Sequence, residues 1–264
     1  MKGFAICAAV VVLAGTAVAG TISITISQAA RISDGNLIVA VKIGNTGDEA
    51  ALSVTPVLRF ADKEVRGKGQ PTLEPNATLE ETLTLPVGPL GEGRWPYRLA
   101  VDYTDQNQYP FQALHTQMAI IGSPPPAKVA VPAIKSEEIA GSGSLTLSVK
   151  NLTAETRTAK VSVLVPEGLE ASDAVRELTL DGWKEDALKV PVTNRTALAG
   201  SRYPVFVTVE YDDDGIHQAV VAQGIVTVGA TESFFTHNRN LLWLIAGAVV
   251  LAWLAFVASR ALRR

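Results

Sequence analysis

Cysteine is almost absent from this sequence. The chain of 264 residues has one, Cys7, inside an apolar run near its start. Disulfides, thiolate metal sites and cysteine nucleophiles are therefore excluded from the part that follows that run. Histidine is scarce too, because only three are present and none belongs to the motif of a metalloprotease or a serine hydrolase. We therefore expect a protein that is not an enzyme and that uses no cofactor and no metal ion.

Positive charge is in short supply over residues 20–238. This part contains 18 basic and 26 acidic residues, a net charge of −8. Nucleic acids and anionic membrane surfaces are bound by basic patches, so no nucleic-acid partner is expected. Solubility alone accounts for an acidic excess of this size.

One stretch without any charge is long enough to cross a membrane. It runs from Leu241 to Ser259 and contains no proline. As a helix its 19 residues would extend about 29 Å, close to the hydrocarbon thickness of a bilayer. Arg239 precedes the stretch, whereas three arginines follow it within residues 260–264. This asymmetry predicts a transmembrane helix over 241–259 in the lipid bilayer and a basic cytoplasmic tail over 260–264.

The start of the chain has the pattern of a secretory signal peptide. Lys2 is basic, an apolar run follows, and Ala17-Val18-Ala19 supplies small residues before Gly20. We expect cleavage after residue 19 and export of the part between the two apolar ends.

The exported part contains two copies of one pattern. Residues recur in the same order at offsets near 107, which indicates two modules. The matching pairs are Val41-Lys42 with Val149-Lys150, Asn45-Thr46 with Asn151-Leu152, Val101-Asp102-Tyr103 with Val209-Glu210-Tyr211, and Gln112-Ala113 with Gln218-Ala219. Three consecutive prolines lie between the copies and favour a semi-rigid spacer. We therefore predict domains over 20–122 and 127–230, a proline-rich linker over 123–126 and a juxtamembrane stalk over 231–240.

Apolar and polar residues alternate within each copy at a period of two. The alternation is clearest at Leu37, Val39, Val41, Val205, Val207 and Val209. Turn signals such as Asp34-Gly35-Asn36 interrupt it about every 8 to 12 residues. Roughly seven short antiparallel strands per copy predict an all-β fold of two tandem immunoglobulin-like β-sandwiches, which pack without a disulfide.

Three segments of the first copy resemble bacterial immunoglobulin-like domains of the cell-adhesion-related (CARDB-like) type. Residues 41–47 are similar to the family's V-x-N-x-G turn, and residues 73–76 are similar to its L-x-P-G entry to a strand, with Asn76 in place of glycine. Residues 93–103 end like the family's G-x-Y-x-x-x-V-x-V-D strand. The second copy departs further, because residues 151–153 lack the turn glycine. The resemblance implies a sandwich fold and a bacterial protein, and it implies no activity.

The acidic turn formed by Asp212, Asp213 and Asp214 is the best candidate for a ligand site. Clustered carboxylates suit calcium, but the D-x-D-x-D-G spacing of a calcium loop is missing. The alternative is a hairpin between the last two strands, where Asp and Gly are ordinary turn residues.

Trp95 and Trp183 both lie next to turn residues. Aromatic side chains at loop edges can stack on sugar rings, which makes both residues candidate contacts for a glycan. More often such residues pack over the open end of a sandwich.

Two functions fit these features. In the first, the chain is a non-catalytic, single-pass protein of the bacterial inner (cell) membrane, with its domains periplasmic or extracellular. These domains mediate protein interaction or scaffold an envelope assembly, so an envelope protein is the expected partner. In the second, they bind a polysaccharide, or serve as the accessory module of a cell-envelope enzyme or export system.

Overall fold

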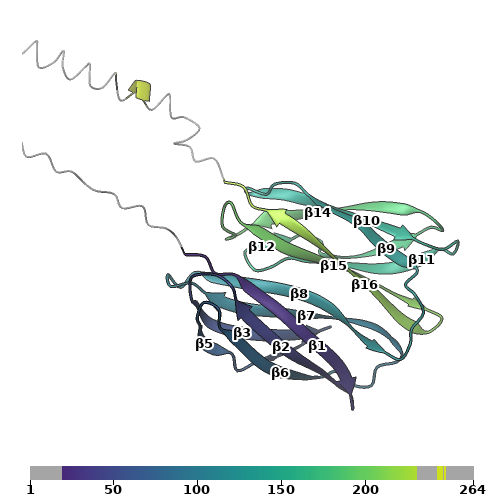
Figure 1. Ribbon diagram of the computed structural model, residues 1–264. Coiled ribbons are helices and arrows are strands. Elements are labelled where there is room, and N and C mark those ends of the chain that lie inside the picture. Colours follow the sequence, from purple (N-terminus) through teal and green to yellow (C-terminus); the bar gives the residue numbers. More distant parts are fainter. Residues whose placement is uncertain (1–19, 231–242, 246, 248–264) are drawn as a thin grey trace, which may run out of the picture. The chain divides into compact units, whose positions relative to one another are not determined.

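The computed structural model describes residues 20–230, 243–245 and 247, and its strands confirm the predicted all-β class (Figure 1). The strands in chain order are β1 (Ile24–Ser33), β2 (Asn36–Asn45), β3 (Ala51–Phe60), β4 (Lys63–Arg66), β5 (Gln70–Leu73), β6 (Thr78–Pro86), β7 (Gly93–Thr104), β8 (Pro110–Ile121), β9 (Val129–Ser136), β10 (Ser142–Asn151), β11 (Arg157–Leu164), β12 (Leu169–Ala171), β13 (Val175–Leu180), β14 (Glu185–Asn194), β15 (Arg202–Asp213) and β16 (Ile216–Thr227).

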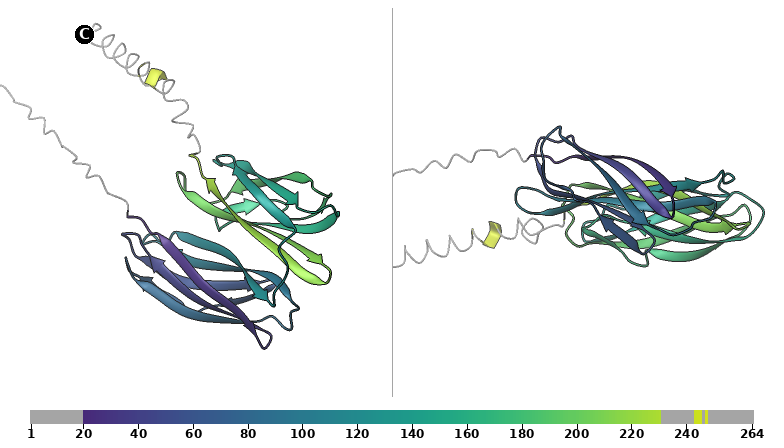
Figure 2. Two further views of the ribbon diagram at one scale, coloured as in Figure 1. Left: turned by 45° about the vertical axis from the view of Figure 1, so that its right-hand side comes forward. Right: turned by 90° about the horizontal axis from the view of Figure 1, so that it is seen from below.

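Contacts divide the chain into two compact units. The first comprises residues 20–88 with 99–113, and the second comprises residues 89–98 with the described residues from 114 onward. In the first unit β1, β2 and β6 form one sheet, while β3 pairs with β4 and β5. In the second unit one sheet has the order β12-β14-β10-β9, and β13, β11, β15 and β16 are neighbours in the other. Figure 2 shows the layers of each unit from two further directions.

Each unit buries one face of its strands, as the alternation predicts. In β2, residues 37, 39, 41 and 43 are almost completely buried. In the second unit, alternate residues of β10, β11 and β15 belong to a single core cluster. Because this cluster draws on both sheets, the second unit is a β-sandwich held by apolar packing.

Two hairpins close on the turn residues that their geometry requires. Asp34 and Gly35 join β1 to β2 with φ of 50° and 72°, and Asp214 and Gly215 join β15 to β16 with φ of 52° and 78°. Positive φ at both central residues defines the type I′ turn, which favours Asp-Gly. The predicted turn at residues 34–36 is confirmed.

A buried asparagine closes a turn in the first unit. Asn45 is fully buried, and its Nδ2 donates to the carbonyl oxygens of Glu49 (2.7 Å) and Leu73 (3.1 Å). Its Oδ1 accepts from the backbone N–H of Gly47 at 3.1 Å. One amide thus satisfies backbone groups from two separate turns, as burial of those groups demands.

Asn151 repeats these bonds in the second unit. Its Nδ2 donates to the carbonyl oxygens of Glu155 (2.7 Å) and Leu180 (3.1 Å), and its Oδ1 accepts from the N–H of Thr153 at 3.1 Å. The pair Asn45-Thr46 and Asn151-Leu152, found in the sequence, therefore marks a structural repeat that extends to individual hydrogen bonds.

Among the described residues, no helix has both the length and the apolar character needed to cross a membrane. The predicted span over 241–259 lies outside the described residues apart from 243–245 and 247, as do the signal peptide (1–19), the stalk (231–240) and the tail (260–264). The proline-rich residues 123–126 lie between β8 and β9. The predicted domain boundaries stay predictions.

Replacing either buried asparagine is expected to destabilise its unit. Asn151→Ala leaves the carbonyl groups of Glu155, Leu180 and Asp181 without this donor, which should lower the free energy of unfolding by about 2–4 kcal/mol. Asn45→Ala should have an effect of the same size. Urea unfolding followed by circular dichroism measures it. The control is Asn107→Ala, an exposed loop residue, whose effect should stay below about 0.5 kcal/mol. Equal stability of Asn151→Ala and the wild type would contradict the assigned role.

Candidate functional site

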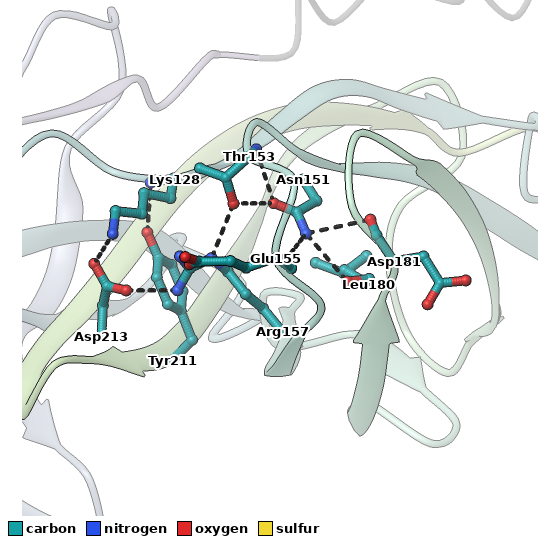
Figure 3. A network of polar contacts seen from close by, with 9 residues as sticks. All are labelled: Lys128, Asn151, Thr153, Glu155, Arg157, Leu180, Asp181, Tyr211 and Asp213. Carbon is teal, nitrogen blue, oxygen red and sulfur yellow. Dashed lines mark hydrogen bonds and ion pairs between the residues drawn. The ribbon is translucent and has the colours of Figure 1, made fainter.

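One end of the second unit gathers a network of polar contacts around three turns (Figure 3). Residues 151–157 connect β10 to β11, residues 181–184 connect β13 to β14, and residues 211–214 belong to the hairpin of β15 and β16. Lys128 lies directly before β9. We call these three turns and Lys128 the turn cluster.

A buried ion pair lies at the centre of the turn cluster. Nη1 of Arg157 donates to Oδ1 of Asp213 at 2.6 Å, and both side chains are less than a tenth exposed. The second oxygen of Asp213 contacts Nζ of Lys128 at 2.7 Å. Arg157 also contacts Glu155 through Nη2 (2.7 Å) and Thr153 through Nε (3.3 Å). The buried guanidinium and carboxylate thus satisfy each other, as charges removed from water must.

The charges of the network fix its protonation states. The Lys128 ammonium, and after it the Arg157 guanidinium, lower the pKa of Asp213 below its ordinary value, although burial opposes them. Asp213 in turn raises the pKa of Lys128. Burial raises the pKa of Tyr211, whose hydroxyl oxygen accepts the backbone N–H of Lys128 at 2.6 Å. These shifts favour an ionised Asp213, a protonated Lys128 and a neutral Tyr211.

The three aspartates proposed as a ligand site do not converge. Asp213 points inward to Arg157, whereas Asp212 is 79% exposed and accepts from Nδ1 of His217 at 3.0 Å. Asp214 forms the hairpin turn. Successive side chains of a strand point to opposite faces, which separates Asp212 from Asp213. Among the described residues, no group of three or more His, Cys, Asp and Glu side chains could hold a metal ion. The turn follows the hairpin interpretation.

Trp95 and Trp183 have different surroundings. Trp95 belongs to the second unit, donates from Nε1 to the carbonyl of Gly91 at 3.1 Å and stacks on His217 with ring centroids 4.1 Å apart. Its ring face is therefore already engaged. Trp183 lies at the tip of the turn between β13 and β14 and is 65% exposed. Of the two, Trp183 is the one that presents an aromatic surface to solvent.

His217 joins the Trp95 stack to two carboxylates. Its Nε2 lies 3.4 Å from Glu210 and its Nδ1 lies 3.0 Å from Asp212. Glu210, and after it Asp212, raise the pKa of His217 above its ordinary value, although burial opposes them. Burial lowers the pKa of the other described histidine, His115.

Sequence reasoning missed Arg157 and Lys128. Arg157 lies on the buried face of β11, the same face as Ala159, Val161 and Val163. An arginine on the apolar face of a strand indicates a buried acidic partner, because a buried arginine is rarely left unpaired. Lys128 had no such signal, because its partner Asp213 is 85 residues away in the sequence.

Comparisons with known proteins give no family. No family model matches the chain, and no curated protein matches it. Among solved structures, a mutant alpha-2-macroglobulin of Salmonella is similar over 79% of this chain and 16% of its own, with 14% identity and a TM-score of 0.34. Escherichia coli alpha-2-macroglobulin activated by porcine elastase is similar over 79% and 22%, with 15% identity and a TM-score of 0.30. Red sea bream transglutaminase is similar over 80% and 31%, with 10% identity and a TM-score of 0.28.

The buried ion pair yields a stability prediction. Arg157→Ala leaves the buried Asp213 carboxylate with Lys128 alone, and should lower the free energy of unfolding by about 2–4 kcal/mol. Urea unfolding at pH 7 measures the change. Arg195→Ala is the matched control, because Arg195 pairs with Glu170 while both side chains are more than half exposed. Its effect should not exceed about 1 kcal/mol. Similar losses in the two variants would show that burial adds nothing to the pair.

His217 yields a pH prediction. Folding raises its pKa, so its contribution to stability is fully present below the unfolded pKa, about 6.5, and is lost as pH rises through the folded pKa. Urea unfolding at several pH values should show a decline above about pH 6.5 that His217→Gln flattens. His115→Gln is the control, because a pKa lowered by burial acts below that range. An unchanged decline in His217→Gln would refute the assignment.

Proposed function

We propose that this chain is a non-catalytic, membrane-anchored protein of the bacterial envelope whose exported domains bind a protein partner or scaffold an envelope assembly. The observation that carries the proposal is the turn cluster. Its buried charged residues, Arg157 and Asp213, form an ion pair with each other. The exposed Trp183 lies on a turn of the same cluster. Paired charges and an exposed aromatic residue on the same group of turns suit recognition by contact, and not proton transfer.

The domains that we propose are two tandem immunoglobulin-like sandwiches of the CARDB-like type. The repeated bonds of Asn45 and Asn151 support this, because they join the same pair of turns in each unit. The chain is exported by the signal peptide over 1–19 and held by a single span over 241–259. The stalk over 231–240 keeps the second domain close to the bilayer, with the domains periplasmic or extracellular.

Polysaccharide binding, or an accessory role beside an envelope enzyme or export system, is the second candidate. The exposed ring of Trp183 favours it, since a free aromatic face can stack on a sugar. The engagement of Trp95 with His217 weighs against a two-tryptophan platform.

Crosslinking in intact cells tests the proposed function. Recovery of a defined envelope protein with the full chain would support a protein-binding role. If polysaccharide alone is retained, and Trp183→Ala abolishes that retention, the glycan-binding alternative replaces it.

The proposed topology predicts opposite results from two reporter fusions. A reporter that works only in the cytoplasm should be active after Arg264 and inactive after Ala230. A reporter that works only outside the cytoplasm should give the reverse, because the arginines that follow residue 259 stay inside. Activity of the second reporter after Arg264 would overturn the orientation.

A further inference from the structure

Trp183 occupies a backbone position at which the first unit has Asn76. In the first unit, Asn76 has φ of 62° and donates its N–H to the carbonyl of Asn45 at 2.8 Å. In the second unit, Trp183 has φ of 58° and donates its N–H to the carbonyl of Thr153 at 2.8 Å. Both residues follow, by three positions, the leucine whose carbonyl accepts from the buried asparagine. The acceptors differ, because the counterpart of Asn45 is Asn151 and not Thr153. The internal bond of each turn is the same, since Ala77 donates to Glu74 at 3.0 Å and Lys184 donates to Asp181 at 3.2 Å. Trp183 and Asn76 therefore occupy the same position of corresponding turns.

The two residues differ in how well they suit that position. Left-handed backbone is tolerated by asparagine, whose short polar side chain can bond locally, and it is unfavourable for a bulky aromatic residue. Burial does not compensate Trp183, because 65% of it is exposed. Neither the backbone conformation of the turn nor packing within the second unit therefore explains why residue 183 is a tryptophan. A residue held against its backbone preference at the surface points to a function.

The neighbouring turn shows the same change from polar to apolar. Leu152 follows Asn151 as Thr46 follows Asn45, and Leu152 is 39% exposed. The two turns are packed tightly, since a Cβ at Gly182 would lie 2.0 Å from the carbonyl oxygen of Ala154. The backbone beneath both apolar residues is therefore fixed before any partner arrives, which limits the entropy lost on binding.

The shape of this surface decides what can cover it. Small-molecule sites are concave, whereas Trp183 lies at the tip of a turn between two strands. The occupant must therefore supply the pocket, which a folded protein can do. Residues 181–186 contain three carboxylates and one lysine, so a pocket with a basic rim complements them.

The position of Trp183 also argues against burial in lipid. It lies two residues before Glu185, the first residue of β14, whereas Asn194 at the other end of β14 donates to the carbonyl of Ala140. The adjacent Ile139 accepts from Gly229, which leads to the predicted anchor. Ten residues of strand separate the two ends by about 33 Å. Trp183 thus lies at the opposite end of the second unit from Gly229, beyond which the chain continues toward the predicted span.

We propose that Trp183, supported by Leu152, is the anchor residue of a protein-binding surface, and that its partner is a protein with an apolar pocket rimmed by Lys or Arg side chains. The inference rests on the proposed function and names the residue and the partner chemistry that carry it. Tryptophan is among the residues in which the hot spots of protein interfaces are enriched.

The experiment starts from the full chain in its native membrane. A photoreactive amino acid replaces Lys184, beside the retained Trp183, and replaces Val175 or Ile225 in parallel chains as exposed controls. The protein captured from position 184 is identified and purified, and its dissociation constant is measured for the wild type and three variants. Trp183→Asn and Leu152→Thr install the residues of the first unit. Val175→Thr is the matched control, because Val175 is 58% exposed on β13.

Trp183→Asn should weaken binding by about 10- to 100-fold, Leu152→Thr should weaken it less, and Val175→Thr should stay within about twofold of the wild type. Because asparagine suits the left-handed position, Trp183→Asn should unfold at the same or a higher urea concentration than the wild type. A fall in binding then cannot be ascribed to misfolding.

Other results separate the two proposals. If the captured protein binds Trp183→Asn as tightly as the wild type, the role given to Trp183 is wrong, while the proposed protein-binding function of the chain stands. If no protein is captured from any of the three positions, the interaction role itself fails. Retention on isolated cell-wall polysaccharide that Trp183→Asn abolishes would assign the tryptophan to a glycan.

Discussion

Each unit depends on satisfying backbone carbonyl groups where two turns meet. A sandwich buries its strands by apolar packing, but at its ends the chain reverses and leaves polar groups that no strand can pair. Asn45 and Asn151 solve this in the same way, with one buried amide donating to carbonyls of both turns. In the second unit this junction holds together the turn that contains Glu155 and the turn that contains Trp183.

The second unit adds charge to this junction. Arg157 occupies the position that Ala51 has in the first unit. Ala51 on β3 lies opposite Leu73 on β5, and Arg157 on β11 lies opposite Leu180 on β13. An alanine there is simply buried, whereas an arginine requires Asp213 and Glu155. The second unit thus has a network of side chains far apart in the sequence, beside the same two asparagine bonds that the first unit makes.

The sequence predicted the repeating features and missed the individual ones. Alternation at period two identified the buried face of β2 and β15, and Asp-Gly marked the hairpins, because both patterns are local. The roles of Asp212 and Asp213 could not be separated, since they depend on which strand face each occupies and on Lys128 far away in the chain. Nor could the sequence show that Trp183 is exposed while Trp95 is stacked.

The route of the chain through the second unit has a mechanical consequence. Lys128 enters at the turn cluster, where its backbone and its ammonium are both held, and Gly229 leaves at the opposite end. Tension between these two points acts along β9, so the hydrogen bonds between β9 and β10 share the load instead of breaking one at a time. A protein fastened at one end and pulled at the other would resist extension through this strand pair first.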